Sequence, residues 1–125
     1  MTLLWQFYFC KNKIIIMTKK FAAINYISCL PEFEPTFENL FATRKGAIDT
    51  MPGFVDMEVL KPSKQGEPYL ILSHWDNKES FDTWTKSPEF LEGHKRGFAM
   101  LEQAKQEGKP APMKSEFKVY KIIAE

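Results

Sequence analysis

The chain has 125 residues, enough for one domain that buries roughly two-thirds of its unfolded surface. Its 17 Lys and Arg residues are interleaved with 16 Asp and Glu residues, a net charge of +1, so we expect no nucleic-acid partner and no membrane binding. Two cysteines, Cys10 and Cys29, are too few for a disulfide framework, which favours a reducing compartment and predicts a cytoplasmic protein.

The first sixteen residues differ from the rest. Two apolar runs, Leu3–Phe9 and Ile14–Met17, are separated by charged residues, and neither approaches the ~20 apolar residues of a membrane span. Their order of charged and apolar residues is not that of a signal peptide. Because Met17 resembles a natural start, we interpret residues 1–16 as an extension without function and residues 17–125 as one domain. The alternative is an extra edge strand or a membrane-touching arm.

A strand and a helix are predicted next. Residues Phe21–Ser28 alternate with period two, which places Asn25 among apolar residues on one face. A helix then begins near Pro35 and keeps apolar residues at three- and four-residue spacing as far as Met51, before the breaker Pro52-Gly53.

Two strands, two helical segments and a last strand follow. Asp76 and Glu79 resemble a capping box that opens a helix, and Ser87-Pro88 starts a second helical segment. Trp84 therefore lies on the first segment and His94 on the second. The remaining elements are a hairpin of strands Phe54–Leu60 and Tyr69–Trp75, a loop Gln106–Lys114 and a strand Glu116–Ile123.

The order β-α-β-β-α-β predicts an α+β fold, a ferredoxin-like sandwich of four antiparallel strands with helices on one face. The strands carry apolar residues on both faces: Leu70 and Leu72 alternate with Tyr69 and Ile71. A sheet with one face in water would alternate more cleanly, so we expect the bare face to pack against the sheet of a second copy in a homodimer.

Three residues are candidates for function. Asn25 interrupts an apolar strand face, and burying its amide without partners costs about 1–3 kcal/mol, although backbone groups could satisfy it. His94 shares a helical stripe with phenylalanines, so it is either a satisfied core residue or an axial ligand to a metal or haem. Trp84 is either a core residue or a rigid wall against a flat ligand.

These residues belong to a wider set of motifs. From Asn25 to the last strand, the sequence resembles the dimeric haem-degrading monooxygenases of the Isd type, within the antibiotic-biosynthesis-monooxygenase (ABM) superfamily. The resemblance implies a dimeric α+β barrel. The motifs that carry it are Asn25, Leu40–Arg44, Met51–Phe54 and, most specifically, Trp75–His94.

The resemblance also implies roles. His94 would be the proximal ligand to haem iron, and Asn25 would donate a hydrogen bond to dioxygen on the distal side. Trp84 would distort the porphyrin from planarity. Haem would then be both cofactor and substrate, cleaved with dioxygen and electrons from a reductase or small reductant to release iron and an open-chain tetrapyrrole. Phe41 and Phe90 would line the haem pocket, and Arg44 would line or support it.

Other parts of the chain are less typical of the family. Lys95–Met100 and the loop Gln106–Lys114 depart from its pattern and should border the pocket, so the haem orientation and cleavage position stay open. The methionines Met57, Met100 and Met113 are interpreted as packing residues. His74 is the competing imidazole, and strand alternation points it away from the side of Trp75.

Two alternatives use the same fold. A cofactor-independent monooxygenase that oxidises a quinol or polyketide would need an aromatic pocket but not Asn25, Trp84 and His94 together. A non-catalytic barrel that carries haem or another hydrophobic ligand would keep the pocket without turnover.

Overall fold

The computed structural model describes residues 7–10, 13–16 and 18–125. Its main element is a four-stranded antiparallel sheet in the order β4-β5-β3-β6. This is the predicted ferredoxin-like arrangement. The first strand of the domain lies inside the sheet and pairs with the last strand, which forms one edge. The strands are β3 (Phe21–Cys29), β4 (Phe54–Leu60), β5 (Tyr69–Trp75) and β6 (Met113–Lys121).

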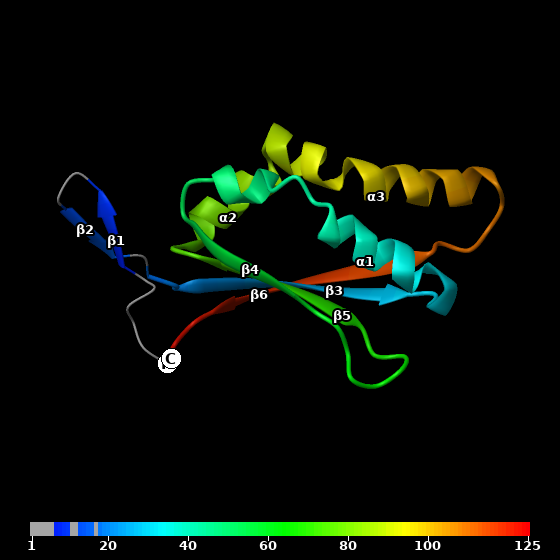
Figure 1. Ribbon diagram of the computed structural model, residues 1–125, viewed down its shortest axis with the longest axis horizontal. Coiled ribbons are helices and arrows are strands. Elements are labelled where there is room, and N and C mark those ends of the chain that lie inside the picture. Colours follow the sequence, from blue (N-terminus) through cyan, green and yellow to red (C-terminus); the bar gives the residue numbers. More distant parts are fainter. Residues whose placement is uncertain (1–6, 11–12, 17) are drawn as a thin grey trace.

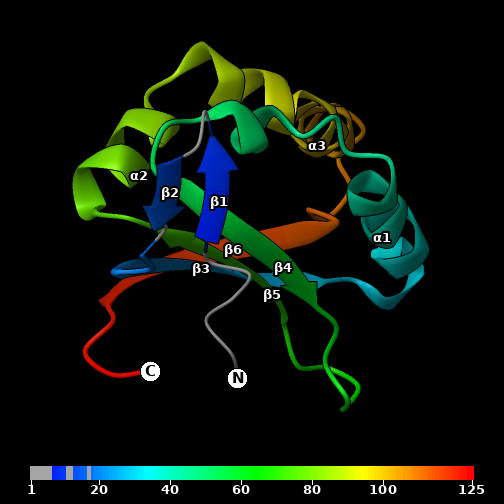
Figure 2. The same ribbon diagram turned by 60° about the vertical axis from the view of Figure 1, so that its left-hand side comes forward.

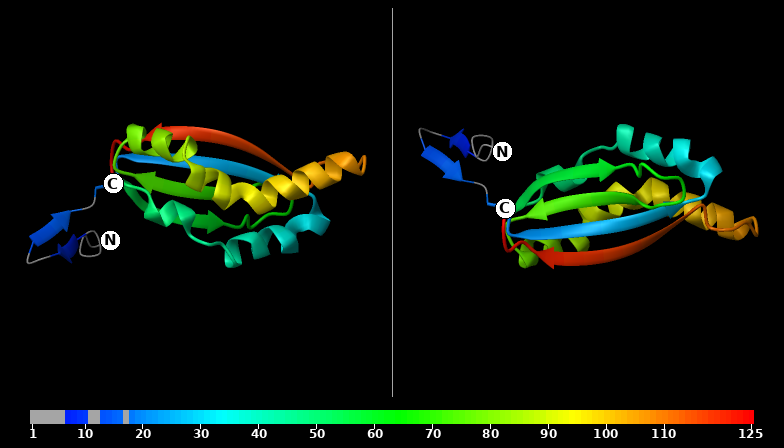
Figure 3. Two further views of the ribbon diagram at one scale, coloured as in Figure 1. Left: turned by 90° about the horizontal axis from the view of Figure 1, so that it is seen from above. Right: turned by 90° about the horizontal axis from the view of Figure 1, so that it is seen from below.

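The helices all lie on one face of this sheet (Figure 1). The longest, α3, crosses above the strands, and α1 lies beside it when the domain is seen from above (Figure 3). The helical elements are η2 (Pro31–Phe33), α1 (Glu34–Ala42), η3 (Ala47–Thr50), α2 (Lys78–Thr85) and α3 (Pro88–Gln106). Within the described ranges, no helix is long and apolar enough to cross a membrane.

The single helix predicted up to Met51 is wrong beyond Ala42. The Thr43 hydroxyl and its N–H both donate to the Asn39 carbonyl oxygen, and this ends α1. Gly46 then adopts a left-handed conformation with φ of 73°, which no helix continues through. The chain turns there and forms η3, which buries Ile48 against the core. The apolar spacing therefore belongs to two helical pieces separated by a turn.

Three other boundaries shift by a few residues. The cap of α2 is Asn77, not Asp76: the Asn77 side chain accepts a hydrogen bond from the Ser80 N–H at 2.8 Å. The final strand begins at Met113, within the predicted loop, and ends at Lys121. The break at Ser87 is confirmed, because the Ser87 hydroxyl accepts from the Phe90 N–H and caps α3.

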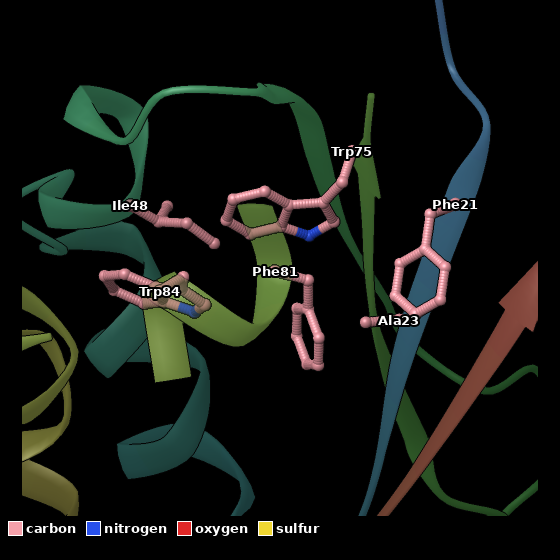
Figure 4. Packing of buried hydrophobic residues seen from close by; sticks show 6 residues of the cluster. All are labelled: Phe21, Ala23, Ile48, Trp75, Phe81 and Trp84. Carbon is pink, nitrogen blue, oxygen red and sulfur yellow. The ribbon is translucent and has the colours of Figure 1, made fainter. Parts of the chain in front are cut away.

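The core lies between the sheet and α2. Trp75 is fully buried, and its ring meets those of Phe54 and Phe81 edge-on, at centroid separations of 5.4 and 5.7 Å. Figure 4 shows Phe81 and Trp84 of α2 and Ile48 of η3 gathered around this indole, facing Phe21 and Ala23 of β3. A second cluster around Phe37 packs α1 against Ile27 and Tyr69.

The opposite face of the sheet carries no helix (Figure 3, right). Apolar side chains lie there beside polar ones, as predicted from the two-sided pattern of the strands. Ile24 of β3 is directly opposite Leu72 of β5 and is half-buried. Tyr120 of β6 is 44% exposed, and its hydroxyl lies 3.3 Å from that of Tyr26. This surface is called the open face below.

The extension contains two paired strands. β1 (Phe7–Cys10) and β2 (Lys13–Ile16) form an antiparallel hairpin of their own, off one end of the four-stranded sheet (Figure 1), and this hairpin is turned forward in Figure 2. The alternative of an extra edge strand on the main sheet is therefore not what these strands form. The remaining residues of 1–16 lie outside the described ranges, and the interpretation of the extension as functionless stays a prediction.

Candidate functional site

A cavity of about 340 Å³ lies between the helix-covered face of the sheet and helices α1 and α3. Its lining is mainly apolar and aromatic, as in pockets for flat organic ligands. The sheet supplies Asn25, Met57, Ile71, Ser73 and Phe117. The helices supply Phe41, Trp84, Phe90, His94 and Phe98, among others. All five predicted site residues, Asn25, Phe41, Trp84, Phe90 and His94, therefore line one cavity.

Asn25 is the polar group on the sheet side of this cavity. It lies on β3 between Ile71 of β5 and Phe117 of β6, and it is 92% buried, since 8% of its surface is exposed. Among the described residues, its Oδ1 atom has no hydrogen-bond partner. The backbone bonding that could have satisfied this amide is therefore absent at Oδ1. A buried amide oxygen that lacks a partner costs roughly 1–3 kcal/mol and points to a ligand or water in the cavity.

His94 approaches the cavity from α3. Its Nδ1 lies 2.7 Å from the Phe90 carbonyl oxygen. A carbonyl oxygen can only accept, so Nδ1 carries a proton, and the tautomer that this contact selects has its lone pair on Nε2. The ring is stacked between Phe90 and Phe98, at centroid separations of 4.1 and 5.6 Å. Metal-binding histidines have this arrangement, with one nitrogen held by a carbonyl and the other available.

Trp84 combines the two roles considered for it. It is a core residue, 5% exposed and packed against the Trp75 cluster, and it also lines the cavity. Its indole meets Phe90 edge-on at 5.3 Å and lies 6.2 Å from the His94 ring. The Ser87 cap ends the α2 region and starts α3, and so places Trp84 and His94 on adjacent walls.

The cavity rim is positively charged. Arg44, Lys45, Lys95 and Arg96 line it, whereas Glu92 is the one acid among the described lining residues. Arg44 is partly neutralised by Asp49, with nitrogen–oxygen distances of 3.3 and 3.4 Å. An apolar interior with a basic rim suits a flat hydrophobic ligand that carries carboxylates.

Sequence reasoning missed Ser73 and, on the basic rim, Lys45. The Ser73 hydroxyl lines the cavity, accepts from Trp75 Nε1 at 3.0 Å and lies 3.5 Å from the Ala23 carbonyl oxygen. In the sequence, Ser73 could have been found as a polar residue on the same strand face as Trp75. Lys45 had no comparable signal, because charged residues near helix ends are usually solvated. The expectation that residues 95–100 border the pocket is confirmed by Lys95, Arg96, Gly97 and Phe98.

The other imidazole lies on the opposite side of the sheet. His74 Nδ1 contacts Asp56 Oδ1 at 2.6 Å, and Asp56 also binds Lys19. His74 is thus directed away from the cavity, as predicted. Of the methionines, Met57 and Met113 line the cavity and also pack against the two core clusters, whereas Met100 is not among the described lining residues. In the described part of the chain, no three His, Cys, Asp or Glu residues are grouped as metal ligands.

Comparison with known proteins identifies the family. The model of the antibiotic biosynthesis monooxygenase family matches residues 20–96, well over half of the chain. The protein therefore belongs to this family.

Its similar relatives include enzymes that act on haem. A heme oxygenase (mycobilin-producing) from Mycobacterium tuberculosis is 35% identical over 65 residues, 52% of this chain and 62% of that protein. A heme-degrading monooxygenase from Bacillus cereus is 41% identical over 51 residues, 39% of this chain and 48% of that protein. The chain thus matches less than two-thirds of the length of these curated relatives.

Solved structures agree on the fold. The heme degrader MhuD of Mycobacterium tuberculosis, with two hemes bound in its active site, has a TM-score of 0.61 and 25% identity, over 84% of this chain and 97% of that one. SnoaB, a cofactor-independent oxygenase from Streptomyces nogalater, has a TM-score of 0.58 and 18% identity, over 86% and 97%. Both have the same fold as this protein.

Proposed function

We propose that this protein is a haem-degrading monooxygenase that opens the porphyrin ring and releases iron and an open-chain tetrapyrrole. The observation that carries the proposal is the pairing of two polar groups across one apolar cavity: the unpartnered Oδ1 of buried Asn25 and the available Nε2 of His94. The relatives that act on haem support the choice of ligand.

The residues fit haem in three respects. His94 offers one neutral imidazole nitrogen, the usual proximal ligand of haem iron. Aromatic rings of Phe41, Trp84 and Phe90 supply flat apolar walls. The other cations of the basic rim, Arg44, Lys45 and Lys95, would accept the two haem carboxylates, since the Arg96 guanidinium already donates to Leu40 and Thr43. When bound, haem would supply the iron that activates dioxygen and the ring that is cleaved.

The chain's own groups would orient this chemistry. His94 would hold the haem iron through Nε2, since the Phe90 carbonyl keeps its ring in one orientation. On the sheet side, the Asn25 side-chain amide would donate a hydrogen bond from its NH₂ group to dioxygen, because a half-turn about the Cβ–Cγ bond brings NH₂ to the position of the unpartnered Oδ1. Trp84 would press on the macrocycle from a fixed position, because the core holds its indole. Dioxygen and electrons from a reductase or small reductant complete the proposed stoichiometry.

Haem titration tests the proposal. Haemin added to the purified protein should give a Soret band that moves in His94→Ala, whereas His74→Gln, a change on the opposite face of the sheet, should leave it unchanged. With ascorbate and air, the wild-type band should decay, iron should be released and mass spectrometry should detect an opened tetrapyrrole. Asn25→Ala should bind haem yet turn it over at least tenfold more slowly, the usual scale for loss of an oriented donor.

The outcomes separate the candidate functions. A bound haem that persists under reductant and oxygen would favour a haem carrier. Absence of haem binding would favour a cofactor-independent oxygenase acting on a quinol or polyketide, the class to which the structural neighbour SnoaB belongs. A Soret band unaffected by His94→Ala would refute ligation by this residue.

We also propose that two copies associate through the open face. Ile24, Leu70 and Leu72 lie on this face without a covering layer, and the strands are apolar on both sides. Packing two such faces together would form a dimeric α+β barrel and bury this apolar surface.

A further inference from the structure

Helix α3, which carries His94, is held over the cavity by few buried contacts. None of its side chains is fully buried, and its more extensive packing is with η3 and α2, around its first half. The residues of α3 that line the cavity run from Phe90 to Leu101, and Phe98 among them is 47% exposed. Helix α1, which forms another wall of the cavity, has no comparable packing with α3, so polar contacts between these two helices matter for the distance between them.

Arg96 joins these two helices. Its Nη1 donates to the Thr43 hydroxyl at 2.8 Å, and its Nη2 donates to the carbonyl oxygens of Leu40 at 2.9 Å and Thr43 at 3.3 Å. The acceptors lie at the C-terminal end of α1, where carbonyl groups lack helical partners and carry partial negative charge. A planar guanidinium meets several such acceptors at once, which a lysine ammonium cannot match in geometry.

Thr43 is adapted to this contact. Its hydroxyl donates a hydrogen bond to the Asn39 carbonyl oxygen at 2.7 Å, so a lone pair of the hydroxyl oxygen is left to accept from Arg96. The bonds form a connected chain from α3 through Thr43 into the last turn of α1. Charge-assisted bonds of this kind are stronger than neutral ones even at partly exposed sites.

Arg96 is placed where this connection affects the cavity. It follows His94 by two residues on α3, and its partners Leu40 and Thr43 flank Phe41 on α1. His94 and Phe41 both line the cavity, on walls that belong to different helices. A tie between residues beside them holds the two walls at a fixed separation.

We infer that Arg96 is a positioning residue, which ties α3 to the C-terminus of α1 and thereby keeps His94 at ligating distance from a molecule bound in the cavity. The tie itself is independent of the ligand. Its consequence for haem rests on the proposed function. Loss of the tie lets α3 move outward, so that bound haem dissociates faster although none of the aromatic walls has changed.

The test compares four variants. Arg96→Met removes all three bonds, Thr43→Val removes one acceptor, and Arg96→Lys keeps the charge without the planar fork. Lys105→Met is the control, because it removes an exposed cation from the same helix outside the cavity lining. Haem loss is followed as transfer to excess apomyoglobin. We expect about tenfold faster loss for Arg96→Met, about threefold for Thr43→Val and Arg96→Lys, and less than about twofold for Lys105→Met.

A second ligand distinguishes positioning from direct contact. Haem dimethyl ester lacks the free carboxylates, so if Arg96 only ties the helices, Arg96→Met should accelerate loss of the ester and of haem by the same factor. Acceleration confined to haem would overturn the inference, because Arg96 would then bind a carboxylate itself.

A measurement without haem keeps the inference separate from the proposed function. In the ligand-free protein, hydrogen exchange of the amides of residues 41–44 and 94–98 should be faster in Arg96→Met, and the double variant with Thr43→Val should add little more. Unchanged exchange in Arg96→Met would refute the tie. Faster exchange in Arg96→Met, together with a wild type that fails to bind haem, would support the tie and refute the proposed function alone.

Discussion

His94 and Phe90 are joined twice: the imidazole Nδ1 lies 2.7 Å from the Phe90 carbonyl oxygen, and the two rings stack with centroids 4.1 Å apart and planes inclined by 28°. The residues are one helical turn apart, so both contacts are local to α3. Together they fix the tautomer and the rotation of the imidazole before any ligand arrives. Such preorganisation spares the ligand the cost of ordering its partner.

Phe90→Ala removes the stack but leaves the backbone carbonyl in place. We expect haem affinity to fall about tenfold and the free energy of unfolding to fall by about 1–2 kcal/mol, because Phe90 is half-buried against Trp84. Haemin titration and urea denaturation measure the two effects. Phe98→Ala is the matched control: its ring is more distant from His94 and 47% exposed, so both effects should be smaller. Equal losses in the two variants would contradict the role given to the stack.

Asn25→Leu separates stability from activity. In the ligand-free protein the buried Oδ1 atom has no partner among the described residues, so replacing the amide with a similar-sized apolar group should raise the free energy of unfolding by about 1 kcal/mol. Thermal unfolding of the ligand-free protein measures this gain. Haem turnover should nevertheless be lost, because leucine cannot make the hydrogen bond to dioxygen that is assigned to the Asn25 amide. A variant that is destabilised by more than 1 kcal/mol would indicate that water already satisfies Asn25.

Local signals predicted much of the fold and site. Period-two alternation placed Asn25 on the inward face of its strand, and the Ser87-Pro88 signal separated Trp84 from His94. Both depend only on neighbours in sequence, and both are confirmed. The same reasoning failed around Gly46, where apolar spacing continued through a residue in the left-handed region. The spacing of apolar residues does not reveal a turn when the apolar residues on both sides of it keep helical spacing.

The missed contacts are those between distant segments. Arg96 reaches Leu40 and Thr43 across more than fifty residues, and no periodicity pairs a cation on one helix with the free carbonyls of another. The partner of His94 could have been found, since a residue four positions earlier on a helix always presents its carbonyl. The lack of a partner for the Asn25 Oδ1 atom could not have been predicted, because whether a buried oxygen finds a hydrogen-bond donor depends on all the residues that surround it in the fold.

Gly53→Ala should be strongly destabilising. Gly53 has φ of 82°, and a Cβ there would collide with the side chains of Asp76 and Ser80 at the start of α2. Left-handed strain and this collision together should lower the free energy of unfolding by about 2–4 kcal/mol. Gly66→Ala is the control, because Gly66 has φ of 91° but a Cβ there meets nothing within 4 Å, so only the backbone strain applies. Urea midpoints give both values, and similar losses would contradict the collision.

Asp56 should contribute to acid unfolding. Burial acts to raise the pKa of its carboxyl, but hydrogen bonds from Lys19 and His74 outweigh this and lower the pKa below its ordinary 3.8. Around pH 3.8, the Asp56 carboxyl is therefore less protonated in the folded protein than in the unfolded chain. The stabilisation is present above that pH and is lost as the pH falls through the lowered pKa.

In Asp56→Asn, the free energy of unfolding should accordingly fall less steeply as the pH is lowered. Urea midpoints between about pH 2 and 5 should fall less steeply with acid than in wild type, since the variant has one carboxyl fewer to protonate. The fall should not disappear, because Tyr69 and Lys61 also lower the pKa of the Glu38 carboxyl. A steeper fall in Asp56→Asn would contradict the sign of the shift.

Ile24→Lys tests the proposed dimer. Ile24 lies directly opposite Leu72 on the open face, so a second sheet packed there would bury the new ammonium without a partner, at a cost of several kcal/mol. Sedimentation should then change from dimer to monomer, with the far-ultraviolet circular dichroism unchanged. Leu91→Lys is the control, because Leu91 is 61% exposed on α3, on the helical side. A wild type that sediments as a monomer, or an Ile24→Lys variant that remains dimeric, would contradict association through this face.

The same pair of variants would also show whether the cavity needs the dimer. The cavity lies on the opposite side of the sheet from Ile24, so haem affinity of the Ile24→Lys monomer should match that of wild type if each copy holds a complete site.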